Sequence, residues 1–207
     1  MPLLSPWYNA NARQIAGVDE VGRGPLAGPV VAAAVVLDPE KPILGLDDSK
    51  KLSEKKREAL DEIIRHSAIA VGVGLVAPTR IDQVNILNAT FEAMGAAVLE
   101  IQRSAQVPLV GLLIDGNTTI PMMQALMQHA VVGGDAIWPC IMAASIIAKV
   151  YRDRLMVEAE KLYEGYGFAK HKGYGTREHL RALHKLGPCP IHRRSFTPVV
   201  QGSLWND

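Results

Sequence analysis

The sequence predicts an α/β fold in which a mixed central β-sheet is flanked by helices. Apolar runs of strand length alternate through the middle of the chain with segments whose apolar residues recur at helical spacing. The opening strands are joined by short turns, and this combination indicates a mixed sheet. With 207 residues, 48% of them hydrophobic, the chain can bury a full core as one domain.

Four segments are predicted to be strands. They cover residues 15–21, 29–37, 69–75 and 108–114. The second and the fourth contain continuous apolar runs, as expected for strands covered on both faces. In the third, the apolar residues alternate with Ala70, Gly72 and Gly74. This alternation indicates a strand whose second face is crowded by a neighbouring element. Residues 131–135 repeat on a smaller scale the pattern of apolar residues, glycine turn and aspartate.

Helices are predicted between and after these strands. They cover residues 54–67, 86–103, 140–163 and 177–185, with a short helix after Pro78. Ser53 is placed to cap the first of them. The residues expected to face inward are Leu60, Ile63 and Ile64 in the first helix and Leu87, Phe91, Met94, Val98 and Ile101 in the second. Small residues at 143–148 allow the third helix to lie close to the sheet.

The chain divides by charge into an acidic body and a basic end. Residues 1–164 hold 15 Lys and Arg against 19 Asp and Glu, a net charge of −4. Residues 165–194 hold seven basic residues against Glu178, a net charge of +6. We expect a loose N-terminal arm over 1–14, a main domain over 15–164, and a basic extension over 165–207 that packs on the same domain. The extension is expected to meet a polyanion; a solvated basic face is the alternative.

Composition excludes several classes of protein. No apolar run reaches the roughly 18 residues that span a bilayer, and the N-terminus lacks the layout of a signal peptide. We therefore expect a cytoplasmic protein without a membrane partner. Cys140 and Cys189 are too few and too far apart for a zinc site, so reduced thiols are expected. Nothing in the chain requires more than a monomer.

Four acids share one position in the pattern, at or just past the end of an apolar run and beside glycine. They are Asp19, Glu20, Asp115 and Asp135. Strand ends in an open α/β sheet are where ligand sites form. Clustered carboxylates repel one another and are stable mainly with divalent cations among them. Oxygen ligands without histidine or cysteine favour Mg²⁺ or Mn²⁺ over Zn²⁺. A pair of such ions is a known device for in-line displacement at a phosphate.

Strand geometry leaves the role of Glu20 open. Adjacent side chains of a strand point to opposite faces, so Asp19 and Glu20 cannot both face one site from a regular strand. Either the strand bends at Glu20, or this residue contributes through its main-chain carbonyl. Asp153 lies between two arginines inside a predicted helix, where a surface ion pair is the expected arrangement.

Seven segments of the chain, including GVDEVGRGPL at 17–26, closely resemble the ribonuclease HII family. The matching segments are residues 17–26, 48–53, 114–117, 134–135, 143–150, 171–174 and 193–196, in family order. The resemblance implies the ribonuclease H fold and metal-dependent endonucleolytic cleavage, with two divalent ions in the active complex. The implied substrates are RNA–DNA hybrids and single ribonucleotides in duplex DNA, and the implied products carry 5′-phosphate and 3′-hydroxyl ends.

The resemblance also implies roles for particular residues. The metal-binding catalytic acids are Asp19, Glu20, Asp115 and Asp135. The turn formed by Gly22, Arg23 and Gly24 is similar to the family's reader of the ribose, and Tyr174 to its stacking partner on that sugar. The 2′-hydroxyl is the group that distinguishes RNA from DNA. Tyr174 could instead pack on the core.

Phosphate contacts are implied for six further residues. They are Lys50, Lys51, Ser145, Lys149, Lys170 and Lys172. Such contacts position a duplex without reading its sequence. Ser145 could equally form an interior hydrogen bond, and Lys149 could extend along the helix surface to solvent.

Two rival functions remain to be weighed. One is a non-catalytic protein that binds hybrid or duplex nucleic acid through the basic extension. The complete set of four acids argues against it, because a binder gains nothing from holding carboxylates opposite a polyanion. The other is a nucleotide-binding module built on residues 22–28, which lacks a following Gly-Lys-Ser/Thr. The sequence does not identify a partner in the replication machinery.

Overall fold

The central feature of the computed structural model is a five-stranded mixed β-sheet with strand order β3-β2-β1-β4-β5. The structure describes residues 5–104 and 108–199. The strands are β1 (Ile15–Val21), β2 (Val30–Val36), β3 (Ala70–Val76), β4 (Gly111–Asp115) and β5 (Met127–Val131). β2 pairs antiparallel with both β1 and β3, whereas β1, β4 and β5 run parallel to one another. The predicted mixed sheet is confirmed.

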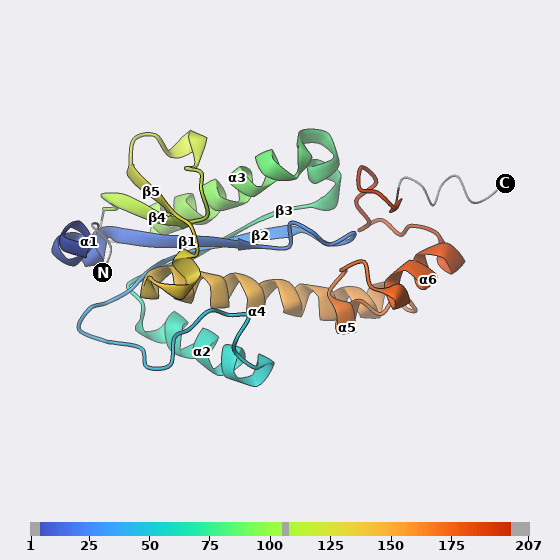
Figure 1. Cartoon of the computed structure of the whole chain (residues 1–207), viewed down its shortest axis with the longest axis horizontal. Helices are drawn as coiled ribbons and strands as arrows, with labels where there is room; N and C mark the ends of the chain where they lie inside the picture. The colour runs from blue at the N-terminus through green and yellow to red at the C-terminus, as the bar shows by residue number, and fades with distance from the viewer. Residues whose placement is uncertain (1–4, 105–107, 200–207) are drawn as a thin grey trace.

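Helices cover both faces of this sheet (Figure 1). The helices are α1 (Ser5–Asn11), α2 (Glu54–Ser67), α3 (Pro78–Ser104), α4 (Pro139–Leu162), α5 (Phe168–His171) and α6 (Arg177–Leu186). Within the part of the chain that the structure describes, there are also three short 3₁₀ helices, η1 (Ala12–Gln14), η2 (Pro121–Met123) and η3 (Gly134–Ala136). In Figure 1, α3 lies on one face, α4 and α2 lie on the other, and α5 and α6 lie beyond one end of the sheet.

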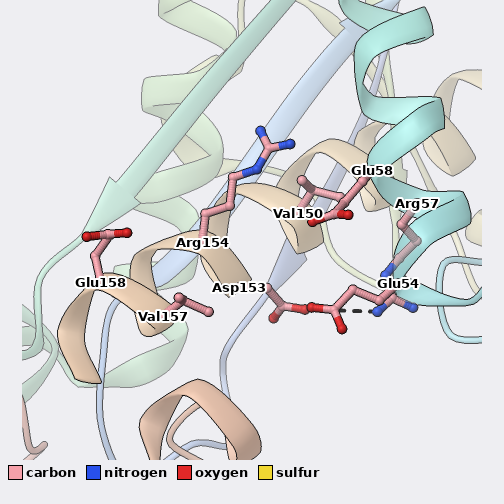
Figure 2. Close-up of a pocket in the computed structure, with 8 residues that line it drawn as sticks. All are labelled: Glu54, Arg57, Glu58, Val150, Asp153, Arg154, Val157 and Glu158. Carbon is pink, nitrogen blue, oxygen red and sulfur yellow. Dashed lines mark ion pairs between the residues drawn. The ribbon is translucent and has the colours of Figure 1, made fainter. Parts of the chain in front are cut away.

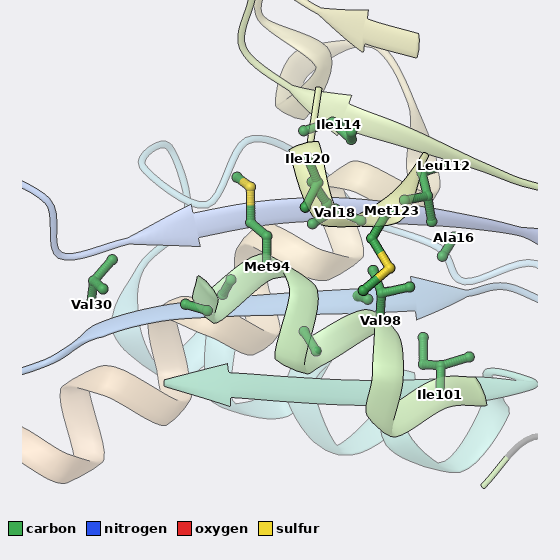
Figure 3. Packing of buried hydrophobic residues seen from close by; sticks show 14 of the residues in the cluster. Ala16, Val18, Val30, Met94, Val98, Ile101, Leu112, Ile114, Ile120 and Met123 are labelled. Carbon is green, nitrogen blue, oxygen red and sulfur yellow. The ribbon is translucent and has the colours of Figure 1, made fainter. Parts of the chain in front are cut away.

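The face covered by α3 holds the larger hydrophobic cluster (Figure 3). Val18 and Val30 of the sheet meet Met94 and Val98 of α3 there, and all four side chains are buried. Gly74 of β3 marks the closest approach. A Cβ atom at Gly74 would overlap the carbonyl oxygen of Ala93. The crowded second face that the alternation in this strand predicts is therefore the contact with α3.

Helix α3 consists of two helical parts joined at Asn85, whose backbone has φ of 68°. The Asn85 side-chain oxygen accepts hydrogen bonds from the N–H groups of Leu87 and Asn88, so it caps the second part. This agrees with the predicted short helix followed by a long one. The prediction that Leu87 faces inward is wrong, because this residue lies in the exposed first turn after the kink and is 45% exposed.

Among the described residues, α3 alone is long and apolar enough to cross a membrane by length and composition. Its apolar side chains pack on the sheet in Figure 3. This is the arrangement of a core helix in a globular domain.

Helix α4 lies close to the opposite face of the sheet. A Cβ atom at Gly17 in β1 would overlap the backbone of Cys140 in α4. Of the small residues predicted for this helix, Ala143, Ala144 and Ala148 are buried in one cluster with residues of β2, as expected. Outside α4 lies α2, which begins after the predicted cap Ser53. Leu60 and Ile64 are buried, but Ile63 is 45% exposed, so its predicted inward orientation is wrong.

The N-terminal segment differs from the predicted loose arm. Residues 1–4 lie outside the described residues, but Ser5–Asn11 form helix α1. The Trp7 ring contacts His129 edge-on at 4.9 Å, and the Tyr8 ring contacts Trp138 at the same distance. These aromatic contacts hold the segment against the sheet. Strand β5 begins at Met127, earlier than the apolar residues at 131 indicate, because an edge strand can carry polar side chains.

Candidate active site

Three acids converge at one edge of the sheet, where the parallel strands β1, β4 and β5 all end. Asp19 lies near the end of β1, Asp115 ends β4, and Asp135 lies in η3 just after β5. One carboxylate oxygen from each lies within 4.8 Å of the others. The backbone N–H of Asp135 also donates a hydrogen bond of 3.2 Å to Asp115 Oδ1. The sheet topology thus brings together residues 96 and 20 positions apart in sequence.

The cluster holds more negative charge than its surroundings neutralise. Burial, followed by the charges of Glu20 and Asp115, raises the pKa of Asp19 to about 8, against the lowering effect of a Ser145 hydrogen bond. Burial also raises the pKa of Asp115. The ammonium of Lys50 lies 3.0 Å from Asp135 Oδ2, but this lysine side chain is 78% exposed. Hard oxygen donors that repel one another in this way fit divalent cations.

Glu20 borders the same site without joining the group of three. It lines one cleft together with Asp19, although the two are adjacent on β1. Its carboxylate pairs with Arg23 at 3.3 Å. Burial raises the pKa of Glu20, and Arg23 opposes that rise. Both acids line the cleft although each pairs in regular register with β2, Asp19 opposite Ala33 and Glu20 opposite Ala32.

The acids open into a cleft of about 460 Å³. It is lined by Asp19, Glu20, Val21, Gly22, Arg23, Gly24, Ser49, Lys50, Asp115, Ser145, Lys149 and Tyr174. The cleft therefore combines Asp19, Glu20 and Asp115 with the predicted sugar-reading turn and several of the predicted phosphate contacts. Asp135 is not among its lining residues, although its carboxylate lies close to those of Asp19 and Asp115.

Tyr174 and the glycine turn form opposite sides of a slot in this cleft. A Cβ atom at Gly24 would meet Tyr174 Cε1 at 3.9 Å and nothing closer. The Tyr174 side chain is 42% exposed, so the alternative of a ring packed in the core does not hold. The guanidinium of Arg152 lies 6.0 Å from the centre of the ring. The partly exposed ring therefore lies opposite a turn residue that has no side chain.

Most of the chain resembles known ribonucleases. A sequence profile of the family "Ribonuclease HII" matches residues 16–199. Ribonuclease HII of Endomicrobium trichonymphae is 52% identical over 193 residues, which cover 93% of this chain and 90% of the relative. The chain belongs to the ribonuclease HII family. It is accordingly a metal-dependent hydrolase that cleaves RNA endonucleolytically in RNA–DNA hybrids.

Solved structures of the ribonuclease HII family share the fold. Ribonuclease H2 of Pyrococcus horikoshii OT3 has a TM-score of 0.72 at 28% identity, covering 92% of this chain and 97% of that one. RNase HII of Archaeoglobus fulgidus, solved as a complex with PCNA, has a TM-score of 0.74 at 29% identity, covering 88% of this chain and 95% of that one. The ribonuclease H-like fold implied by the resemblance is confirmed.

Not all predicted contacts of this ribonuclease HII lie at the cleft. Lys50, Ser145 and Lys149 line it, whereas Lys51, Lys170 and Lys172 do not. Ser145 is buried and its hydroxyl bonds Ser49 Oγ at 2.8 Å, which matches the alternative of an interior hydrogen bond. Lys51 pairs with Asp47, Lys170 with Glu178, and the Lys172 ammonium donates to the Ala169 carbonyl.

Asp153 forms ion pairs, but the expectation of a surface pair is wrong, because this residue is only 7% exposed. Its carboxylate lies 2.8 Å from the Lys149 ammonium and 4.0 Å from the Arg57 guanidinium. Figure 2 shows the Arg57 pair beside a cavity of about 170 Å³ between α2 and α4. Arg57 also donates to the carbonyls of Ser49 and Leu52, so it anchors the loop that carries Lys50.

Sequence reasoning missed two buried arginines behind the glycine turn. Arg152 and Arg193 are both 0% exposed, and their guanidinium groups donate to carbonyls of the turn and its continuation. A signal for Arg152 was present in the sequence. It stands four residues after Ala148 and four before Met156, both on the buried face of α4.

Proposed function

We propose that this ribonuclease HII cleaves both the RNA strand of hybrids and single ribonucleotides embedded in duplex DNA. The proposed products carry 5′-phosphate and 3′-hydroxyl ends. The observation that supports this is that the glycine turn and the partly exposed Tyr174 ring line the same cleft as Asp19 and Asp115, two of the three converging acids.

Asp19, Asp115 and Asp135 are proposed to hold two divalent ions, Mg²⁺ or Mn²⁺, with Glu20 contributing at the edge of the group. Bound ions of this kind supply Lewis acidity that lowers the pKa of water and neutralises charge that develops on the phosphate. Ser145 supports this arrangement by hydrogen bonding to Asp19. Lys50 can leave Asp135 when cations enter, since its side chain is mostly exposed.

The turn and Tyr174 are proposed to select the ribonucleotide. Gly22 has φ of 90°, a left-handed conformation that favours glycine, and Gly24 has no side chain to occupy the slot. Backbone groups of the turn can therefore approach the 2′-hydroxyl, while the Tyr174 ring packs on the sugar.

Basic side chains are proposed to hold the duplex by its phosphates. Lys50 and Lys149 act at the cleft, and Lys51, Lys170 and Lys172 act on the surrounding surface. These contacts position the duplex without reading its sequence. The division into a catalytic part at 15–164 and a basic substrate-binding extension at 165–207 remains part of the proposal, although residues 200–207 lie outside the described residues. We further propose that the chain acts as a monomer, because one chain supplies all the residues that line the cleft. We also propose that it acts in the cytoplasm.

The test is cleavage of a labelled DNA duplex with one ribonucleotide, incubated with Mg²⁺, with Mn²⁺ and with EDTA. We expect a metal-dependent cut beside the ribonucleotide that leaves a 3′-hydroxyl end. Asp115→Asn should abolish the cut while hybrid binding, measured by fluorescence anisotropy, stays largely intact. Cleavage in EDTA, or full cleavage by Asp115→Asn with Mg²⁺, would rule out the metal assignment. The family assignment already argues against the non-catalytic binder.

A further inference from the structure

Two fully buried arginines lie behind the glycine turn without carboxylate partners. Arg152 of α4 and Arg193 near the C-terminal end are both 0% exposed. Neither forms an ion pair with any acid in residues 5–104 or 108–199. A buried charge is ordinarily paired, because removing it from water is costly. Burial, followed by the charge of Arg152, lowers the pKa of Arg193 to about 9. Burying two unpaired cations side by side is costly, so we asked what these two side chains do for the fold or the site.

Their hydrogen bonds all go to main-chain carbonyls. Arg193 donates to Gly22 at 2.5 Å, to Arg23 at 2.8 Å and to Gly28 at 3.0 Å. The backbone N–H of Arg193 also donates to the carbonyl of Leu26. Arg193 thus binds carbonyl groups at four positions along the loop from Gly22 to Gly28. A planar guanidinium with donors in fixed directions can hold three carbonyls at once, which the single ammonium of a lysine cannot do in the same geometry.

Arg152 joins this loop to the loop that carries Tyr174. It donates to Ala27 at 3.1 Å, to Pro29 at 2.9 Å and to Lys172 at 2.9 Å. The backbone of Leu26 also donates to the Gly173 carbonyl at 2.8 Å. Both sides of the slot are thus tied to one buried side chain.

The direction of the carbonyls determines what the turn presents to the cleft. In a trans peptide the C=O and the N–H point in opposite directions. Because Arg193 holds the carbonyls of Gly22 and Arg23, the following N–H groups, those of Arg23 and Gly24, point away from it. Neither N–H has an acceptor among the described residues. Successive outward N–H groups form a concave donor site for an oxygen ligand.

We propose that Arg152 and Arg193 are positioning residues for ribose recognition. They orient the N–H groups of the glycine turn toward the 2′-oxygen and hold the turn at a constant distance from Tyr174. This inference rests on the proposed function of the slot and deepens it. The two arginines touch neither the sugar nor the phosphate, and they act through the main chain of the turn.

The test compares Arg193→Lys and Arg152→Lys with Arg154→Lys. Arg154 lies on the same helix as Arg152, but it is exposed and pairs with Asp61, so it is a matched control. Each variant is given a DNA duplex with one ribonucleotide and the same duplex with a 2′-fluoro nucleotide at that position. We expect the ratio of kcat/KM between the two substrates to fall by about tenfold in the first two variants, as for the loss of one well-formed hydrogen bond. The control keeps the wild-type ratio. A ratio of two rates is insensitive to a general loss of folded protein.

The outcomes separate this inference from the function on which it rests. If the wild type does not prefer the ribonucleotide, the proposed function fails. If the wild type does and folded Arg193→Lys and Arg152→Lys discriminate equally well, the positioning role is overturned. A second measurement uses the wild type alone. It tests the inference even if the variants do not fold. The amide resonances of Arg23 and Gly24 should shift in NMR spectra on binding the ribonucleotide duplex without metal and stay in place with an all-DNA duplex. Equal shifts with both duplexes would also overturn the inference.

Discussion

The buried carboxyl group of Asp19 destabilises the metal-free protein when it is ionised. Its carboxyl is 6% exposed, and its pKa is raised to about 8 by burial, Glu20 and Asp115. A folded-state pKa above the unfolded value means that the folded protein binds the proton more tightly. Stability from this group is therefore present at low pH and is lost as pH rises from about 4 to about 8.

We predict that Asp19→Asn stabilises the metal-free protein while abolishing cleavage. The gain in the free energy of unfolding should be on the order of 5 kcal/mol at pH 8 and small at pH 4, because only the ionised carboxylate is penalised. Urea unfolding in EDTA at both pH values measures it. If Asp19→Asn instead lowers the free energy of unfolding at pH 8, the ionised Asp19 carboxylate does not destabilise the folded protein.

Gly24 offers a second test at the level of one residue. Its φ is not positive, and an added Cβ would have open space except toward Tyr174. Gly24→Ala should therefore leave the melting temperature nearly unchanged and lower kcat/KM for a ribonucleotide duplex by about tenfold, since the methyl group narrows the slot. Thermal unfolding and cleavage kinetics check both parts. Wild-type kinetics in Gly24→Ala would exclude the slot as the sugar site.

At the scale of elements, a chain of buried histidines connects the C-terminal segment, α6 and the Tyr174 loop. The Cys189 N–H donates to His192 Nδ1 at 3.0 Å, so the proton of this ring lies on Nε2. His192 Nε2 then donates to His179 Nε2 at 3.0 Å, and His179 Nδ1 donates to the Tyr174 carbonyl at 2.9 Å. His171 of α5 stacks on His179 at 4.5 Å. The chain of hydrogen bonds requires neutral rings.

This arrangement predicts acid sensitivity. Burial, followed by the charge of His179, lowers the pKa of His192 to about 4, and burial also lowers that of His179. A folded pKa below the unfolded value of 6.5 gives stability that is present above about pH 6.5 and is lost as pH falls toward 4. His192→Gln should flatten the dependence of the unfolding free energy on pH in this window. His66→Gln, at an exposed position on α2, is the control and should leave the slope unchanged. Equal slopes in both variants would contradict the prediction.

Local sequence patterns predicted most elements because their causes are local. The bounds of β1 and α2 agree with the predicted ranges, since strand alternation and a capping serine act over a few residues. Helix α1 was not predicted, and strand β5 was predicted only in part. Their stability comes from contacts with distant residues, such as those of Trp7 with His129.

At the scale of the whole molecule, charge is separated between the acidic body and the basic end. Arg177, Arg181 and Lys185 of α6 line one open hollow together with Lys170, whose ammonium pairs with Glu178. This distribution of charge supports binding to the phosphate backbone of a duplex. The affinity for the duplex should then fall as the salt concentration rises.

We predict that the double variant Arg177→Ala with Arg181→Ala binds hybrid duplex more weakly. The slope of log Kd against log salt should decrease in magnitude by about 2, as expected for two lost phosphate contacts. Fluorescence anisotropy over a KCl series measures this slope. The matched control is Lys55→Ala with Lys56→Ala on the exposed side of α2. An unchanged slope in the α6 variant would show that the duplex phosphates do not contact Arg177 and Arg181.

The sequence by itself determined the fold class, the family and the acids placed at strand ends. These follow from short-range patterns and from motifs whose residues are contiguous. Only the tertiary structure decided that Glu20 shares the cleft of Asp19, which lysines border that cleft, and that Arg193 reaches the carbonyl of Gly22 across 171 positions. Contacts between residues so far apart in the sequence depend on how the whole sheet and its helices pack. A local sequence pattern does not determine which distant residues come into contact.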